Sequence, residues 1–318
     1  MTDTLLTTKP TKLGASVKGD TEYTAFARQL QDNWRVKNNF PIGSYKNVKG
    51  EVIQLGNYIE RKFAFKTGAN FLSPRILSVV KNTLNKKELG AKIEETRLFT
   101  NLLSSQPLAF NLFSELSLDK KLATEFFCDF FPNRISEVNE IIFEHSSGRG
   151  NCEYTCDHSA FDVFVLYKPI NGNKGFIGIE VKYAENLKDK PSKHKARYEE
   201  LTDDSKLFKN GSKDLLKLRP IQQIWRDHLL SIAHLNHKKE NFDDGFFVYL
   251  FPKRNEECQE AVDKYIMQFE SYDPVLKKHN ERLTGFYIRY VDDFVAKLRQ
   301  LNKEDWTKEL IDRYLGKK

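Results

Sequence analysis

Three charged residues interrupt two apolar runs near the middle of the chain. Asp162 lies in the first run, residues 161–167, while Glu180 and Lys182 lie in the second run, residues 176–183. The segment between the runs is rich in glycine and asparagine and contains a proline, which predicts a turn and therefore a β-hairpin. Because an isolated ionised group is costly to bury, a carboxylate in such a strand usually has a partner or binds a metal. Two carboxylates and a lysine that converge predict a divalent-cation site with a general base or charge stabiliser beside it.

The alternation of side chains along a strand determines which of these residues share a face. In the second strand Glu180 and Lys182 are expected on the same face as Gly178, and a shift of one residue would move Lys182 to the other face. An alternative interpretation is an edge hairpin whose charged side chains are simply solvated. The opposite face of the second strand is expected to hold Ile177, Ile179, Val181 and Tyr183. One face of the first strand is expected to hold Phe161, Val163, Val165 and Tyr167, and its other face Ala160, Asp162, Phe164 and Leu166.

An Asp followed, after a strand and a turn, by Glu-x-Lys resembles the signature of the PD-(D/E)xK nuclease superfamily. The resemblance implies an α/β restriction-endonuclease-like core in the order helix, three strands, helix, strand, with a central mixed sheet flanked by helices. Phe161 stands where the proline of the motif's name is expected. The candidates for the core elements are a helix over 110–131, strands over 138–144, 161–167 and 176–183, a helix over 220–235 and a last buried strand over 245–252.

The resemblance extends beyond the core, from about Arg28 onward, to a narrower restriction-endonuclease subgroup. It is carried by residues 101–107, 110–113, 143–145, 159–162 and 226–230. The polar, threonine-rich residues 1–20 predict a disordered tail. Residues 21–107 are interpreted as a helical N-terminal elaboration with a short extended segment at 51–59, and residues 108–318 as the nuclease core with a basic insertion at 184–219 and C-terminal helices.

The mechanism that the resemblance implies is metal-assisted hydrolysis of a phosphodiester. Asp162 and Glu180 would bind Mg²⁺, or Mn²⁺, helped by the backbone carbonyl of Val181. Lys182 would either orient or deprotonate the attacking water, or offset the charge that develops on the phosphorus. Glu144 is favoured as a further acidic ligand because it should emerge near the mouth of the sheet, although an ordinary strand-end carboxylate is an equal alternative. Glu115 in the first core helix is a second candidate.

Two groups of residues are candidates for nucleic-acid contacts. A basic cluster follows the second strand directly and could grip a phosphate backbone, or it could be a solvated loop. Gln223 and Arg226 could touch DNA from the helix over 220–235, or they could serve in capping or packing. RecB-like nucleases carry Gln-x-x-x-Tyr on this helix, whereas here the residue four positions after Gln223 is Asp227. His228 lies on the apolar stripe of the same helix and is predicted to be a core histidine. The basic cluster comprises Lys188, Lys190, Lys193, Lys195 and Arg197.

Composition narrows the class of protein. Lys and Arg number 51 against 44 Asp and Glu, a net charge of +7 that favours a polyanionic partner. No apolar run approaches the roughly 18 residues of a membrane helix, and no signal peptide is apparent, so a cytoplasmic protein without membrane contact is expected.

The few cysteines also favour a reducing compartment. A zinc site at Cys152, Cys156 and His158 with Cys128 is weighed against a loop with incidental thiols, which is favoured.

The favoured hypothesis is therefore a Mg²⁺-dependent DNA endonuclease in restriction or phage defence. One alternative is a nuclease of the same fold that acts as a DNA-repair exonuclease or that cleaves RNA. The other is a noncatalytic member that binds nucleic acid or a protein, against which the intact Asp162, Glu180 and Lys182 argue. By analogy, the protein could act as a homodimer or as a subunit of a defence complex.

Overall fold

A five-stranded mixed sheet forms the centre of the protein in the computed structural model, which describes residues 17–47, 49–91, 93–185, 187 and 191–316. The first three strands pair antiparallel, and the last three pair parallel. This arrangement confirms the predicted α/β restriction-endonuclease-like fold. The strands, in their order across the sheet, are β3 (Ile135–His145), β4 (Phe161–Pro169), β5 (Gly175–Val181), β6 (Asp244–Phe251) and β7 (Phe286–Tyr290).

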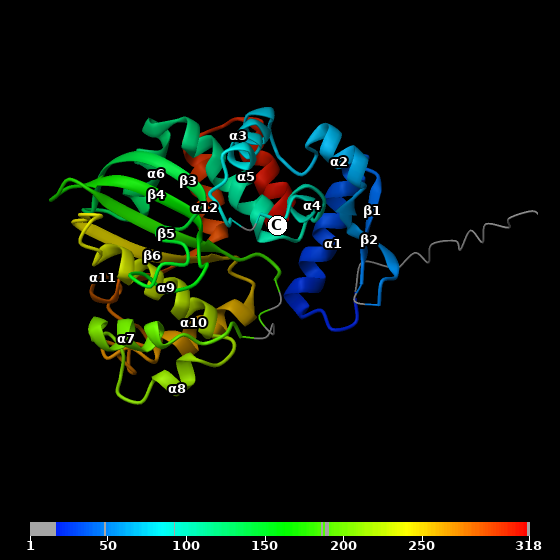
Figure 1. Cartoon of the computed structure of the whole chain (residues 1–318). Helices are drawn as coiled ribbons and strands as arrows, with labels where there is room; N and C mark the ends of the chain where they lie inside the picture. Colours follow the sequence, from blue (N-terminus) through cyan, green and yellow to red (C-terminus); the bar gives the residue numbers. More distant parts are fainter. Residues whose placement is uncertain (1–16, 48, 92, 186, 188–190, 317–318) are drawn as a thin grey trace, which may run out of the picture.

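Helices cover both faces of this sheet, and each face has its own apolar core (Figure 1). One face packs against α5 (Ser105–Leu118), α6 (Lys120–Phe130) and α12 (Val291–Leu301), and the other against α9 (Gln222–Leu235) and α10 (Glu256–Ile266). Strands buried on both sides explain the near-continuous apolar runs in the sequence. The shorter helices are α7 (Ala196–Ser205), α8 (Lys213–Leu216), α11 (Glu281–Thr284) and α13 (Asp305–Leu310), the last followed by a π-helical turn, Ile311–Leu315.

The N-terminal part adds helices and a hairpin that join the α5 side of the core. Its elements are α1 (Glu22–Lys37), β1 (Ile42–Lys46), β2 (Val52–Ile59), α2 (Arg61–Thr67), α3 (Pro74–Asn85) and α4 (Glu95–Thr100). The extended segment expected at 51–59 pairs antiparallel with β1. Residues 1–16 of the predicted disordered tail lie outside the described residues, whereas Asp20 accepts hydrogen bonds from Arg28 on α1. On the same helix, Gln31 donates to the Tyr183 hydroxyl at 2.8 Å, which links α1 to the chain just beyond β5.

The strands expected over 138–144, 161–167 and 176–183 differ from β3, β4 and β5 by up to three residues at their ends, and other elements also differ from the prediction. The helix expected over 110–131 is two helices, because Asp119 adopts an extended conformation and its carboxylate accepts a hydrogen bond from the Leu122 N–H, which starts α6. The helix expected from Pro220 begins at Gln222, since residues 219–221 form a turn. The strand expected to be last is followed by β7, a short strand at the sheet edge.

The predicted alternation of side chains holds along β4 and β5 with one exception. Val163, Val165 and Tyr167 share the core on the α5 side with the predicted face of β5, but Phe161 belongs to the core on the α9 side. There it stacks with Phe164, with ring centroids 5.7 Å apart. Phe161 crosses over Gly178, where a Cβ atom would lie only 2.4 Å from its ring. A glycine at this position therefore lets the strand end that carries Asp162 lie close to β5.

The connection between β3 and β4 is closed by a bond that we did not predict. Cys152 and Cys156 form a disulfide, where a loop with incidental thiols was expected, while Cys128 and Cys258 are free. Among the described residues, no helix combines the length and the apolar character needed to cross a bilayer.

Replacing Gly178 by alanine tests the close approach of Phe161. The added methyl group would overlap the ring, so we expect Gly178→Ala to lower the free energy of unfolding by about 1–3 kcal/mol in urea denaturation. Phe161→Leu makes room for the added methyl group. The double variant should therefore lose less unfolding free energy than the sum of the losses in the two single variants. Strict additivity would show that the two side chains do not compete for the same space.

Candidate active site

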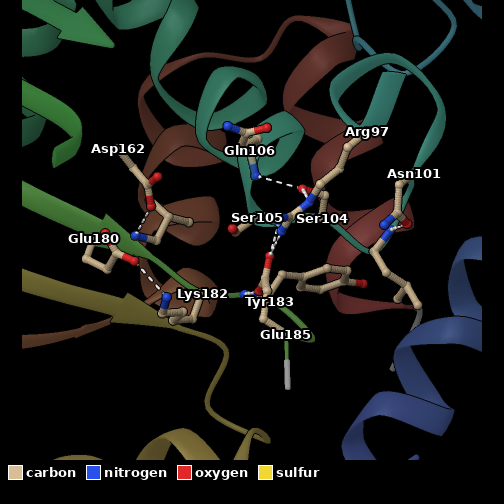
Figure 2. A network of polar contacts seen from close by, with 12 residues as sticks. Arg97, Asn101, Ser104, Ser105, Gln106, Asp162, Glu180, Lys182, Tyr183 and Glu185 are labelled. Atoms are coloured by element: carbon tan, nitrogen blue, oxygen red, sulfur yellow. Dashed lines mark hydrogen bonds and ion pairs between the residues drawn. The ribbon is translucent and has the colours of Figure 1, made fainter. Parts of the chain in front are cut away.

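The charged residues of the two central strands meet in a cavity of about 380 Å³ beyond the end of β5. Asp162, Glu180 and Lys182 all line it, as the strand alternation predicted (Figure 2). The N-terminus of α5 closes one side of the cavity and the first turns of α9 close another. These helices and their neighbours contribute Arg97, Ser105, Gln106, Glu185, Ser192, Arg219, Gln222, Gln223 and Arg226 to the lining.

Asp162 lies where the pairing of β4 with β5 stops. The last paired residues are Val163 and Ile179, and beyond them the Val181 N–H donates to Asp162 Oδ2 at 2.8 Å. Burial, together with the negative charges of Glu180 and Glu144, raises the pKa of Asp162 well above its usual range, against the lowering effects of Lys182 and the Val181 N–H. The protein thus holds this carboxylate where a further positive charge would stabilise its ionised form.

Glu180 and Lys182 form a buried ion pair that a helix residue completes. Lys182 Nζ donates to Glu180 Oε1 at 2.7 Å and to Gln223 Oε1 at 3.0 Å, and Gln223 Nε2 donates to the same Glu180 oxygen at 2.8 Å. Burial lowers the pKa of Lys182, but the charges of Glu180, Glu185 and Asp162 outweigh this effect and raise it overall. Lys182 is therefore an ammonium at neutral pH, and Gln223 holds both members of the pair from α9.

The two candidates for a further acidic residue lie in different environments. Glu144 accepts a hydrogen bond from Gln106 Nε2 at 2.9 Å, and its backbone has a left-handed φ of 55°. Burial and the negative charge of Glu180 raise its pKa to about 6. Glu115 instead accepts a hydrogen bond from Ser73 at 2.7 Å and pairs with Arg75, at the start of α3. Of the two, Glu144 is the one that interacts electrostatically with Asp162.

Arg226 reaches the cavity from α9 between two carboxylates. Its Nε lies 3.7 Å from Asp157 Oδ2 and 3.4 Å from Asp227 Oδ1, and its Nη1 donates to Ser192 Oγ at 2.6 Å. Burial lowers the pKa of Arg226, whereas the two carboxylates raise it overall. Burial also raises the pKa of Asp227 to about 7. His228, the next residue, is a core histidine as predicted, with its ring nitrogens bonded to Tyr265 and to the Thr284 carbonyl.

Sequence reasoning missed a group of cavity residues that come from outside the two strands. Glu185 accepts hydrogen bonds from the Ser105 N–H at the start of α5, from the Tyr183 N–H at 2.8 Å, and from Arg97 Nη2 at 3.3 Å (Figure 2). Arg97 Nε also donates to Ser104 Oγ at 2.9 Å. The available signal was Glu185 itself, an acidic residue three positions after Lys182, but nothing in the sequence indicated its partners.

The predicted basic cluster is only partly described. Lys188 and Lys190 lie outside the described residues. Lys193 is exposed, Lys195 directly precedes α7, and Arg197 donates to the Tyr154 carbonyl at 3.1 Å and to Glu200 at 2.9 Å. None of these three lines the cavity. Their contact with nucleic acid stays a prediction, while Arg97, Arg219 and Arg226 are the arginines that line the cavity.

The donor atoms present fit a Mg²⁺ or Mn²⁺ ion. Asp162 and Glu180 supply two carboxylates, and the charge of Glu180 raises the pKa of Asp162, an effect that a divalent cation would oppose. Within the described ranges no three acidic, imidazole or thiol side chains are grouped closely enough to hold an ion. Two carboxylates, a backbone carbonyl, water and substrate phosphate form an ordinary Mg²⁺ set. The disulfide, in contrast, removes the thiolates of Cys152 and Cys156 that the zinc alternative required.

Comparison with known proteins agrees with this geometry. A family model described as the PD-(D/E)XK nuclease superfamily matches residues 18–316, nearly the whole chain. The match does not test the narrower restriction-endonuclease subgroup. No match to the chain is found among curated proteins or among solved structures. With its mixed sheet, its flanking helices and its Asp162, Glu180 and Lys182 side by side, the chain belongs to the PD-(D/E)XK nuclease superfamily.

Proposed function

We propose that the protein is a Mg²⁺-dependent nuclease that hydrolyses phosphodiester bonds of DNA, acting as an endonuclease in restriction or phage defence. The observation that supports this proposal most strongly is the convergence of Asp162, Glu180 and Lys182 in one cavity with Gln223. A merely structural ion pair at a strand end would not require the adjacent Asp162, whose ionisation is disfavoured where it stands. Such an arrangement is expected where the fold keeps a carboxylate ready for a cation.

The roles of the residues follow from their protonation states. Asp162 and Glu180, with the carbonyl of Val181, would hold the ion, which would polarise the scissile phosphate and lower the pKa of a bound water. Lys182 donates to Glu180, and the surrounding carboxylates raise its pKa, which favours the ammonium form in the metal-free site. Of its two candidate roles we therefore favour orienting the water and offsetting the negative charge that develops on the phosphate.

The surroundings of the cavity suit a polyanionic substrate. Arg97, Arg219 and Arg226 line the same cavity as the carboxylates, and the chain as a whole carries +7. Asp157 and Asp227 hold Arg226 at the cavity wall, so its guanidinium could contact a phosphate without first being ordered. A cytoplasmic location remains part of the proposal. So does a homodimer or a defence-complex subunit, because a chain with one site needs a second site or a second binding event to cleave both strands of a duplex.

Cleavage of supercoiled plasmid with Mg²⁺ or Mn²⁺ tests the proposal directly. We expect nicking or linearisation by the wild type and a loss of at least about 100-fold in Asp162→Asn and Lys182→Gln. Lys264→Gln, which changes an exposed lysine on α10, is the matched control and should cleave normally. Equal activity in all variants would contradict the assignment of the site. Linear, single-stranded and RNA substrates distinguish the exonuclease and RNA alternatives, and binding without any cleavage would favour a noncatalytic member.

The stability of the metal-free protein tests the role of Glu144. Its raised pKa of about 6 means that ionisation disfavours the folded state above that pH and has no effect below about 4.5. Glu144→Gln should therefore stabilise the metal-free protein by roughly 1–2 kcal/mol at pH 7.5 and by nothing at pH 4. Added Mg²⁺ should stabilise the wild type more than the variant.

Glu115→Gln is the matched control for this experiment. Its carboxylate accepts a hydrogen bond from Ser73 and pairs with Arg75, so its replacement should destabilise the protein at pH 7.5, with no difference in the response to Mg²⁺. The measurement is urea denaturation at both pH values, with and without Mg²⁺. If Glu144→Gln behaves like Glu115→Gln, Glu144 does not share its electrostatic environment with the metal site.

A further inference from the structure

A second cavity, of about 780 Å³, lies beside the catalytic one, between the β1–β2 hairpin and the starts of α2 and α4. We call it the hairpin groove. Its volume falls in the range of roughly 300–1,000 Å³ that is usual for ligand sites. The strand motif does not point to it, because the whole groove lies in the N-terminal part of the chain. The side chains used below are Tyr45, Tyr58, Lys46, Arg61, Arg97 and Asn101.

Two tyrosine rings stack on each other in this groove. The rings of Tyr45 on β1 and Tyr58 on β2 are stacked, with centroids 5.4 Å apart and planes inclined by 13°. Both residues are half-buried, and neither belongs to the two apolar cores. The exposed apolar side chain of Val52 also lines the groove. An aromatic pair of this kind, outside the core and open to a cavity, suits a ligand that stacks.

The charges around the tyrosines suit a ligand that also carries phosphate. Lys46 and Arg61 are exposed at the groove, and the Arg97 side chain is 44% exposed. The two acidic residues of the groove are helix caps: Glu60 accepts hydrogen bonds from two N–H groups at the start of α2, and Glu94 does the same at α4. The positive ends of these helices partly offset both carboxylates, which leaves Lys46 and Arg61 as exposed cations beside Arg97.

The groove and the catalytic cavity share a wall. Arg97 lines both, and its guanidinium is fixed by Ser104 and Glu185 at the N-terminus of α5. Tyr58 forms an isolated β-bridge with Asn101, and the Leu102 N–H donates to the Asn57 carbonyl at 2.9 Å. In Figure 2, Arg97 and Asn101 lie on the side of the site away from Asp162 and Glu180. The hairpin is therefore tied to the segment that leads into the active site.

We propose that the hairpin groove binds an unpaired stretch of the nucleic-acid strand that enters the catalytic cavity. One or more bases stack on the Tyr45–Tyr58 pair, and Arg97 contacts the phosphate between the stacked base and the scissile bond. Bases in an intact duplex are already stacked on each other, so the ligand is a single-stranded segment, an overhang or a splayed end. This inference rests on the proposed function and assigns to it a preference for substrates with an unpaired segment.

The test is a binding experiment that does not depend on cleavage. The parent protein is the full-length Asp162→Asn variant without divalent cations. Dissociation constants are measured by fluorescence anisotropy for a blunt DNA duplex, for the same duplex with a 5′ or 3′ overhang, and for the matching RNA overhangs. An overhang with 2-aminopurine reports stacking through the quenching of its fluorescence.

The variants separate stacking from a structural role of the hairpin. Tyr45→Ala and Tyr58→Ala should each weaken overhang binding by roughly 5- to 100-fold and abolish the 2-aminopurine quenching, while blunt-duplex binding changes less than about twofold. Tyr45→Phe keeps the ring and should bind like the parent. Tyr272→Ala is the matched control, because Tyr272 is also half-buried and lies near a lysine, Lys209, but lines neither cavity.

The possible failures are distinguishable. If the parent binds overhangs but the tyrosine variants bind them equally well, the groove inference is overturned and the proposed nuclease function stands. An equal loss of blunt-duplex and overhang binding also overturns the inference, since it shows a structural effect of the hairpin. If the parent binds no nucleic acid of any kind, both the groove and the proposed function are overturned. A preference for RNA overhangs would keep the groove and change the substrate.

Discussion

The buried ion pair between Glu180 and Lys182 is the interaction on which the site depends. Burial and the negative charge of Glu180 raise the pKa values of both Asp162 and Glu144, and the Lys182 charge opposes that effect at Asp162. Gln223 donates to Glu180 and accepts from Lys182, so the pair is held from the helix side as well as from the strand. Burying a charge is costly unless its partners are held in place. This explains why α9 and the strands β4 and β5 meet at the ion pair.

The two-sided core is what brings those partners together. The sheet holds Asp162 and Glu180 on adjacent strands, α9 approaches from one face with Gln223 and Arg226, and the N-terminus of α5 arrives from the other with Ser105 and its neighbours. Because both faces of the sheet are packed, the strand end is the place where charged side chains can reach an open cavity. The glycine at 178 contributes by letting Phe161 fold over the sheet beside Asp162.

The N-terminal part is joined to this centre rather than appended to it. Gln31 on α1 donates to the Tyr183 hydroxyl, just beyond β5, and the buried Arg313 near the C-terminus donates to Gln31 at 3.1 Å. Arg97, from α4, stands between the catalytic cavity and the hairpin groove. The elements that we expected to be a helical elaboration thus supply part of the wall of the cavity that holds Asp162 and Glu180. Under the proposed function, a nucleic-acid strand leaving the cavity on this side would meet the hairpin next.

The central hairpin, the face that Glu180 and Lys182 share, and the order of the core elements were predictable from the amino-acid sequence, because they follow from local periodicity and from a motif. The sequence also indicated His228 as a core residue, since an apolar helical stripe is a local pattern. Four features were not predictable in this way: Gln223 holds the ion pair, Arg97 and Glu185 join the site, Phe161 leaves its expected face, and β7 extends the sheet. Each of these depends on contacts between segments far apart in the chain, and no periodicity in either segment specifies which residues will meet.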